Sequence, residues 1–174
     1  MPWWPYFQKI EEVDIFVMLG QCQFEKNGYQ NRFNIGSKWF TMSVNKGLDP
    51  IYSKEYIHYR EDWERITKVF PIMDRFDHCC TKNLYVTNAA IIQSACVLLG
   101  IDNIIEPDFV TESTGTERLV EICKRYHCNE YLSGISGKNY LNEQLFLDAG
   151  ISISYQDESA MIKKPLVEVL NERI

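Results

Sequence analysis

The amino-acid sequence predicts a single α/β domain over residues 1–174, with a mostly parallel sheet flanked by helices and a β-hairpin excursion near the N-terminus. The apolar run Asp14–Leu19 has the composition of a buried strand. From Gly100 onward, strand and helix patterns alternate at short intervals, which favours parallel strands joined by right-handed crossovers. A length of 174 residues suits one hydrophobic core.

The elements before Gly100 follow from local residue patterns. Pro5–Val13 predicts a short helix, because Pro5 is tolerated in a first helical turn. We expect Asp14–Leu19 to be a strand buried on both faces and ended by Gly20. The other predicted elements are a hairpin of Phe33–Ile35 and Trp39–Val44 around Gly36-Ser37, a strand at Tyr56–Tyr59, a helix from about Asp62 that Pro71 interrupts, and a helix from Asn83 or Thr87 to Leu99 that Gly100 caps.

The C-terminal part predicts three strands and three helices in alternation. Ser113 or Thr114, together with Glu117, has the spacing of a capping box at the start of the first of these helices. In open parallel sheets, ligands bind beyond the carboxyl ends of the strands. The predicted elements are the strands Asn103–Glu106, Tyr131–Ser133 and Ile151–Tyr155, and the helices Ser113–Tyr126, Tyr140–Ala149 and Pro165–Glu172.

Composition excludes several classes of protein. A net charge of −6 argues against general binding to a nucleic-acid backbone, although a local basic patch would still allow DNA or RNA as a substrate. No apolar run approaches the roughly 18–20 residues needed to span a bilayer, so no membrane span is expected. The first residues lack the pattern of a signal peptide. We therefore expect a cytoplasmic protein whose six cysteines are reduced.

The loop after the first predicted strand is rich in side-chain amides. Gln21, Gln23 and Asn31, together with Arg32, suit a polar anionic ligand, because a guanidinium binds phosphate or carboxylate as a fork. Gln23, Asn31 and Arg32 are the candidates for catalysis. The alternative is a surface loop whose amides cap its own turns.

Two later loops also follow predicted strands. Thr111–Arg118 opens a helix whose amide groups could hold an anion, although plain capping is the commoner role. Ser133–Tyr140 carries glycines, hydroxyls and a lysine that could cradle a phosphate, or it is a tight turn; it lacks Walker A spacing. We expect these loops to converge into one polar pocket. The predicted ligand- or phosphate-binding residues are Gln21, Arg118, Ser133, Gly134, Ser136, Gly137, Lys138 and Tyr140.

Neither cysteine–histidine cluster has zinc-site spacing. One contains Cys123, His127 and Cys128, and the other is His78–Cys80; neither has Cys-x-x-Cys spacing. No metal and no cofactor are predicted, and a nucleotide or nucleotide sugar would enter as a substrate.

Several stretches, in the same order along the chain, resemble the WbqC-like family of bacteria and their phages. The most distinctive is Gln23–Arg32, with the sequence QFEKNGYQNR. The departures are a missing initial strand with its Gln-Pro-x-x-x-Pro motif, Gly20-Gln21 in place of an acidic pair, and Cys22 in place of valine. The other similar stretches are Pro2–Ile10 with Val13–Val17, Trp39–Val44, Gly115–Cys123, Tyr131–Gly134, Gly137–Leu141 and Gly150–Asp157.

The resemblance implies a bacterial or phage context, often with O-antigen and other surface-polysaccharide genes. It favours a transferase acting on an activated, nucleotide-linked sugar, for example by amino-acid or acyl transfer. One alternative is transfer of an amino acid to a hypermodified base in phage DNA, and another is a non-catalytic binding or assembly protein. The expected partner is a small molecule or a modified base, and a homo-oligomer is compatible with the sequence.

Overall fold

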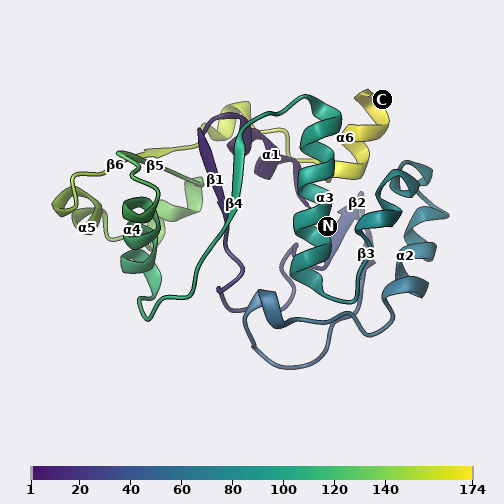
Figure 1. Cartoon of the computed structure of the whole chain (residues 1–174). Helices are drawn as coiled ribbons and strands as arrows, with labels where there is room; N and C mark the ends of the chain where they lie inside the picture. Colours follow the sequence, from purple (N-terminus) through teal and green to yellow (C-terminus); the bar gives the residue numbers. More distant parts are fainter. Residues whose placement is uncertain (1, 174) are drawn as a thin grey trace. The chain divides into compact units, whose positions relative to one another are not determined.

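The computed structural model describes residues 2–173 and divides into two compact units (Figure 1). Unit 1 comprises Met1–Pro107 with Ile162–Ile174, and unit 2 comprises Asp108–Met161. Helices and short strands occur in both units, so the predicted α/β class is confirmed. The expectation of a single domain stays a prediction.

The strands of the described residues form three two-stranded sheets. In unit 1, β1 (Ile15–Met18) pairs in parallel with β4 (Ile104–Pro107), and β2 (Arg32–Ile35) pairs antiparallel with β3 (Lys38–Thr41). In unit 2, β5 (Glu130–Ser133) pairs in parallel with β6 (Ser152–Tyr155). Two of the three pairs are parallel, as predicted, but they do not join into one large sheet among the described residues. Each strand has only four residues, so each ladder is short.

The helices agree with most of the predicted ones. Asn83 caps the N-terminus of α3 by accepting a hydrogen bond from the Val86 amide, and Gly100 ends this helix in the left-handed conformation. The segment around Pro71 leaves the α-helical conformation, as expected. The α-helices are α1 (Trp4–Glu11), α2 (Tyr59–Thr67), α3 (Leu84–Leu99), α4 (Gly115–Arg125), α5 (Glu143–Asp148) and α6 (Leu166–Arg173), and the 3-10 helices are η1 (Ile51–Ser53), η2 (Pro71–Cys79), η3 (Ile135–Asn139) and η4 (Glu158–Ala160).

Two local predictions in unit 1 are wrong. Tyr56–Tyr59 is not a strand, because the Tyr56 amide donates to the Lys82 carbonyl whereas the Ile57 amide donates to the Ser43 carbonyl. The backbone there bonds to two different segments, and no ladder forms. In β1, Phe16 and Met18 are buried while the alternating residues are only half-buried, so the strand is not buried on both faces.

Two predicted features of unit 2 also differ. Thr114 occupies the N-cap position of α4, but its side chain makes no capping hydrogen bond. The Thr111 hydroxyl instead donates to Glu121, and the Ser113 amide donates to the Thr111 hydroxyl oxygen. The predicted helix from Tyr140 begins later, because Asn142 caps α5 and the preceding residues form η3.

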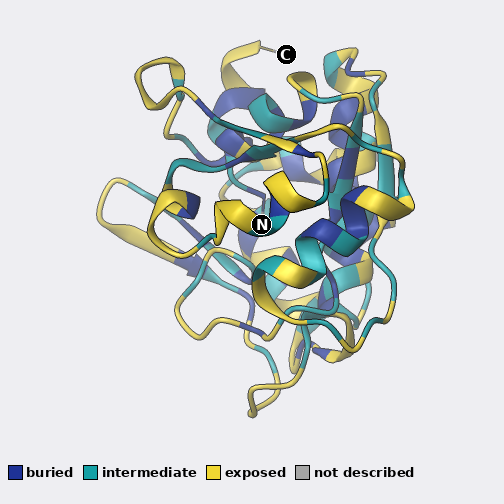
Figure 2. Ribbon diagram, turned by 90° about the vertical axis from the view of Figure 1, so that its left-hand side faces the viewer, coloured by how far each residue is buried: buried dark blue, intermediate teal, exposed yellow. Residues whose placement is uncertain are grey.

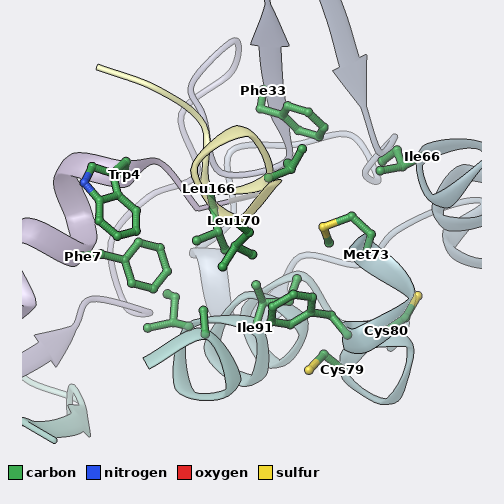
Figure 3. Packing of buried hydrophobic residues seen from close by; sticks show 14 of the residues in the cluster. Trp4, Phe7, Phe33, Ile66, Met73, Cys79, Cys80, Ile91, Leu166 and Leu170 are labelled. Carbon is green, nitrogen blue, oxygen red and sulfur yellow. The ribbon is translucent and has the colours of Figure 1, made fainter. Parts of the chain in front are cut away.

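The core of unit 1 joins the two ends of the described chain. Figure 3 shows Trp4 and Phe7 of α1 packed together and facing Leu166 and Leu170 of α6. In Figure 2 the buried positions are dark blue, and helices carry both buried and exposed positions. Within residues 2–173 no disulfide links the six cysteines. Unit 2 has its own cluster of buried residues, made of Val120, Cys123, Phe146 and Ile151.

No helix in residues 2–173 has both the length and the apolar character required to cross a bilayer.

Candidate functional site

A cavity of about 200 Å³ lies within unit 1, at the carboxyl end of β1. Ligand crevices form at this end of the strands in open parallel sheets. The start of α1, the end of β1, the following loop and the first turns of α3 all contribute to the cavity. Its lining consists of Pro2, Trp3, Tyr6, Met18, Leu19, Tyr29, Gln30, Ile51, Tyr85, Asn88, Ala89 and Ile92.

Stacked aromatic side chains form one wall and continue beyond the cavity. The Trp3 and Tyr29 ring centroids lie 5.0 Å apart in a stacked arrangement, and Tyr29 lies 5.8 Å from Trp39. We call Trp3, Tyr29 and Trp39 the aromatic ladder. Trp3 occupies the N-cap position of α1, whereas Tyr29 and Trp39 remain 44% and 43% exposed. Exposed ring surface of this kind can stack against a planar ligand.

The first two turns of α3 provide two more lining residues. The Tyr85 hydroxyl donates to the Met18 carbonyl at 3.4 Å. The Tyr85 ring also packs against Gly20. A Cβ atom at position 20 would lie 2.7 Å from this ring, which explains why a glycine follows Leu19 after the end of β1. One turn on, Asn88 Nδ2 donates to the Gln30 carbonyl at 2.8 Å. Asn88 Oδ1 is buried and has no hydrogen-bond partner within the described part of the chain.

The candidate residues in the loop after β1 are close in sequence to residues that line the cavity, but they do not line it themselves. Asn31 is buried, and its Nδ2 donates to the Met42 carbonyl at 2.9 Å, so it secures the loop to the end of β3. Arg32 donates to the Asn27 carbonyl, and its guanidinium lies 4.1 Å from the centre of the Trp39 ring. Gln21 is half-buried, and Gln23 is exposed beside Pro50. The lining residues between Gln21 and Arg32 are Tyr29 and Gln30, and neither was predicted from the sequence as a site residue.

Arg118 of the second loop has an ionic partner in unit 2. Its guanidinium donates to Asp108, and both side chains are largely buried. The carboxylate already balances the charge of Arg118, although the Arg118 Nε has no hydrogen-bond partner among residues 2–173. The arrangement therefore favours a structural role over anion binding.

The Ser133–Tyr140 loop is wound into η3. The Gly137 amide donates to the Gly134 carbonyl and the Tyr140 amide to the Gly137 carbonyl, so the turn itself uses these amides. Ser133 is buried, and a Cβ on Gly137 would lie 2.0 Å from its Oγ, so the turn requires glycine at this position. Lys138 Nζ lies 4.9 Å from the Tyr155 ring centre. Ser136, Lys138 and Tyr140 are exposed.

Gln21, Gln23, Asn31 and Arg32 lie in unit 1, while Arg118 and the Ser133–Tyr140 loop lie in unit 2. Their convergence into a single pocket stays a prediction, as does their role in binding.

Ionisable groups in unit 1 are shifted by burial and by ion pairing. Burial lowers the pKa of Lys9 to about 8, with Glu12 opposing the shift. Lys54 is fully buried, and its Nζ donates to Asp49 at 3.0 Å and to the Gly47 carbonyl at 2.8 Å. The hydrogen bond from Lys54 lowers the pKa of the Asp49 carboxyl. Lys54 thus holds the loop before η1 in place.

One cysteine cluster has the composition of a nucleophilic site. Cys79 Sγ lies 3.3 Å from His78 Nε2 and 3.4 Å from Ser94 Oγ. Burial raises the pKa of the Cys79 thiol, which keeps it protonated and poorly nucleophilic. Among residues 2–173, no group of three or more His, Cys, Asp or Glu side chains is arranged to hold a metal ion.

Tyr85 and Asn88 were not predicted as site residues, because both lie inside a predicted helix and not in a loop that follows a predicted strand. A polar Asn88 directly before Ala89-Ala90-Ile91-Ile92 was the available signal. Trp3 and Tyr29 belong to stretches that carry the family resemblance, but only the tertiary structure stacks them together.

Comparison with known proteins supports the resemblance stated above. The model of the WbqC-like protein family matches residues 1–68 and 58–163. The uncharacterized protein Rv1507c of Mycobacterium tuberculosis is 27% identical over 183 residues, which cover 90% of this chain and 78% of that protein. No solved structure matches the chain. Because the family matches span most of its length, the chain belongs to the WbqC-like protein family.

Proposed function

We propose that this chain is a cytoplasmic transferase that binds a nucleotide-linked sugar and transfers an amino-acid or acyl group to it in surface-polysaccharide biosynthesis. The observation that carries the proposal is the aromatic cavity of unit 1, with its stacked Trp3 and Tyr29 rings and the amides of Gln30 and Asn88. The family resemblance contributes the context of activated sugars. The nucleotide sugar would be a substrate, and no separate cofactor is required.

The size of the cavity limits what it can hold. Its volume of about 200 Å³ lies below the roughly 300–1,000 Å³ of sites that enclose a whole drug-sized ligand. One ring of a nucleotide sugar therefore fits inside, and the remainder of the ligand would lie outside.

The aromatic ladder connects the cavity wall to a cationic group. Tyr29 stacks on Trp3 inside the lining and also contacts Trp39, over which the Arg32 guanidinium lies at 4.1 Å. A guanidinium held against an aromatic face keeps a defined orientation and can donate to phosphate oxygens. Arg32 would thus bind the diphosphate of a ligand whose ring occupies the cavity.

Among residues 2–173, no side chain that lines the cavity carries a thiol, an amine or a carboxylate. Its contribution to a transfer reaction would be binding and orientation, which accelerate a reaction between two bound substrates by placing them in contact. This agrees with a direct transfer from donor to acceptor.

Calorimetric titration and thermal-shift assays against a broad panel of nucleotide sugars test the proposal. We expect selective stabilisation by a subset of the panel, because a ligand that binds only the folded state raises its melting temperature. Tyr29→Ala and Arg32→Ala should each weaken binding roughly 10- to 100-fold, given typical energies of stacking and charge-assisted hydrogen bonds. Tyr52→Ala and Arg75→Ala are matched controls, since both residues are exposed and outside the lining. Absence of any response across the panel would refute the proposal.

A non-catalytic binding protein is the second candidate. The lack of thiol, amine and carboxylate side chains in the described lining favours it, as does Gly20-Gln21 at the place of the acidic pair expected from the resemblance. Mass spectrometry after incubation with a bound nucleotide sugar and activated amino-acid or acyl donors separates the two. A modified sugar supports the transferase, and tight binding without turnover supports the binding protein. Arg32→Ala and Lys138→Ala extend the test, because a transferase would lose activity whereas a binding protein could keep its partner.

A further inference from the structure

Three donor atoms meet between η2 and α3 of unit 1, outside the residues that line the cavity. His78 and Cys79 belong to η2, and Ser94 belongs to α3. Cys79 Sγ lies 3.3 Å from His78 Nε2 and 3.4 Å from Ser94 Oγ, and Nε2 lies 3.2 Å from Oγ. The three atoms therefore form a nearly equilateral triangle, with each atom within hydrogen-bonding range of the other two.

The triangle has one buried corner and two that solvent can reach. Cys79 is buried, whereas Ser94 is half-buried and His78 is exposed. Figure 3 shows the sulfur atoms of Cys79 and Cys80 on different sides of η2, and Cys80 Sγ donates to the Tyr59 carbonyl at 3.8 Å. Only one of the two neighbouring thiols therefore takes part in the cluster, and an ion can approach it from the His78 side.

Hydrogen bonds alone leave this arrangement incomplete in one tautomer of the imidazole. The thiol and the hydroxyl each have one hydrogen, and Nε2 is an acceptor when the ring proton is on Nδ1. Two protons then serve three contacts, so one pair of atoms faces each other with lone pairs only. A cation placed between the three atoms would be attracted by the lone pairs of all of them.

The side lengths of the triangle match the ligands of a tetrahedral zinc ion. Zinc binds sulfur at about 2.3 Å, nitrogen at about 2.0–2.1 Å and oxygen at about 2.0–2.2 Å, so tetrahedral angles separate such donors by about 3.4–3.6 Å. The observed 3.2, 3.3 and 3.4 Å are each within about 0.3 Å of the corresponding separation. An ion with two ligands in a line would need nitrogen and sulfur about 4 Å apart.

We propose that His78, Cys79 and Ser94 bind a Zn²⁺ ion through Nε2, Sγ and Oγ, with a water molecule in the fourth position. Imidazole and thiolate are preferred zinc ligands, and the hydroxyl is the weaker third one. Binding replaces the S–H bond of Cys79 by a Zn–S bond and releases the proton to solvent. Such an ion would join η2 to α3. The proposal is independent of the proposed function.

The spacing of the residues explains why zinc was not expected from the sequence. His78 and Cys79 are adjacent, and Ser94 follows Cys79 by 15 residues on another element. This pattern differs from the paired cysteines and histidines by which zinc sites are recognised in a sequence.

Titration of the reduced, metal-free protein with Co²⁺ tests the proposal directly. Tetrahedral Co²⁺ bound to a thiolate gives a sulfur-to-cobalt charge-transfer band in the near ultraviolet together with strong visible bands. We expect one equivalent of Co²⁺ to produce these bands and Zn²⁺ to abolish them by displacement. Absence of the bands at millimolar Co²⁺ would overturn the proposal.

Alanine substitutions locate the bound ion. His78→Ala and Cys79→Ala should each weaken Zn²⁺ binding at least about 100-fold, since changes to residues that only orient a ligand already weaken it roughly 10- to 100-fold. Ser94→Ala should weaken it about 10-fold, because water can replace the hydroxyl. Cys80→Ala and His58→Ala are matched controls, a buried cysteine whose sulfur points elsewhere and an exposed histidine, and both should bind Zn²⁺ normally.

Thermal unfolding provides a second readout. Zn²⁺ should raise the melting temperature of the unmodified protein and of Cys80→Ala, but not that of His78→Ala. His78 is exposed, so His78→Ala should fold and decide the question even if Cys79→Ala does not fold. Cobalt bands that persist in His78→Ala and disappear in Cys128→Ala would assign the ion to the cysteines of unit 2 and overturn the proposal.

Discussion

At the scale of single residues, the buried polar groups differ in whether their atoms have hydrogen-bond partners. Lys54 is buried and satisfied, because Asp49 and backbone carbonyls surround its ammonium group. Asn88 is satisfied at Nδ2 but not at Oδ1. Lys9 is a third case, in which burial disfavours the charged form more than the carboxylate of Glu12 favours it, and the pKa falls to about 8.

The shifted pKa of Lys9 predicts a pH dependence of stability. The amine has a pKa of about 8 in the folded chain and an ordinary value of 10.5, so between these values the unfolded chain binds more protons. The contribution of Lys9 to the free energy of unfolding should therefore rise as the pH rises from about 8 to 10.5. Lys9→Met should remove this rise and be more stable near neutral pH, by up to about 3 kcal/mol.

Urea denaturation at a series of pH values measures the effect. Lys26→Met is the control, since Lys26 is exposed, and its stability curve should run parallel to that of the unmodified protein. A Lys9→Met curve that also runs parallel across this pH window would contradict the prediction.

At the scale of elements, α3 links the core to the candidate site. Its buried face contains Leu84, Ile91 and Ala95, and its first turns carry Tyr85 and Asn88 into the cavity lining. The position of these two side chains depends on the first turn of the helix staying formed. That turn is closed by Asn83, whose Oδ1 accepts from the Val86 amide at 2.9 Å.

Two N-cap positions with different hydrogen bonding allow a matched comparison. Asn83→Ala should lower the free energy of unfolding by about 1–2 kcal/mol, because it removes a capping hydrogen bond. Thr114→Ala, at the N-cap of α4, should change it by less than about 0.5 kcal/mol, because this side chain makes no capping bond. Urea denaturation followed by circular dichroism measures both. Equal losses in the two variants would count against the observed caps.

At the scale of the whole molecule, each of the two compact units has its own cluster of buried side chains. The chain leaves unit 1 at Pro107 and returns at Ile162 to form α6, whose Leu166 and Leu170 are fully buried in the core of unit 1. Unit 1 therefore requires residues from both ends of the chain, whereas unit 2 is continuous in sequence.

Replacing a buried side chain by alanine in either unit should reduce the stability of that unit. Leu166→Ala and Phe146→Ala should each destabilise the affected unit by about 2–5 kcal/mol, because both side chains are fully buried. Hydrogen exchange followed by mass spectrometry should show faster exchange in β1 and α3 for Leu166→Ala, and in β5 and α5 for Phe146→Ala.

The control for this pair is Leu147→Ala, since Leu147 is 66% exposed. It should leave the exchange rates nearly unchanged. Uniformly faster exchange over both units in either core variant would show that they unfold together as one domain.

The sequence by itself determined the features that depend on neighbouring residues. The α3 helix between Asn83 and Gly100, the break at Pro71 and the hairpin around Gly36 follow local rules of capping, ring geometry and turn formation. The family resemblance likewise rests on residues in linear order.

Only the tertiary structure decided the features whose partners are distant in the chain. The segment around Tyr56 does not form a strand, because the Tyr56 amide donates to the Lys82 carbonyl while Tyr56 forms an isolated bridge with Val44. These two partners lie on separate segments. The cavity exists because α1, β1 and α3 bring Trp3 and Asn88 to the same place. Hydrogen bonding and burial over such separations depend on packing in three dimensions, which residue type and spacing do not specify.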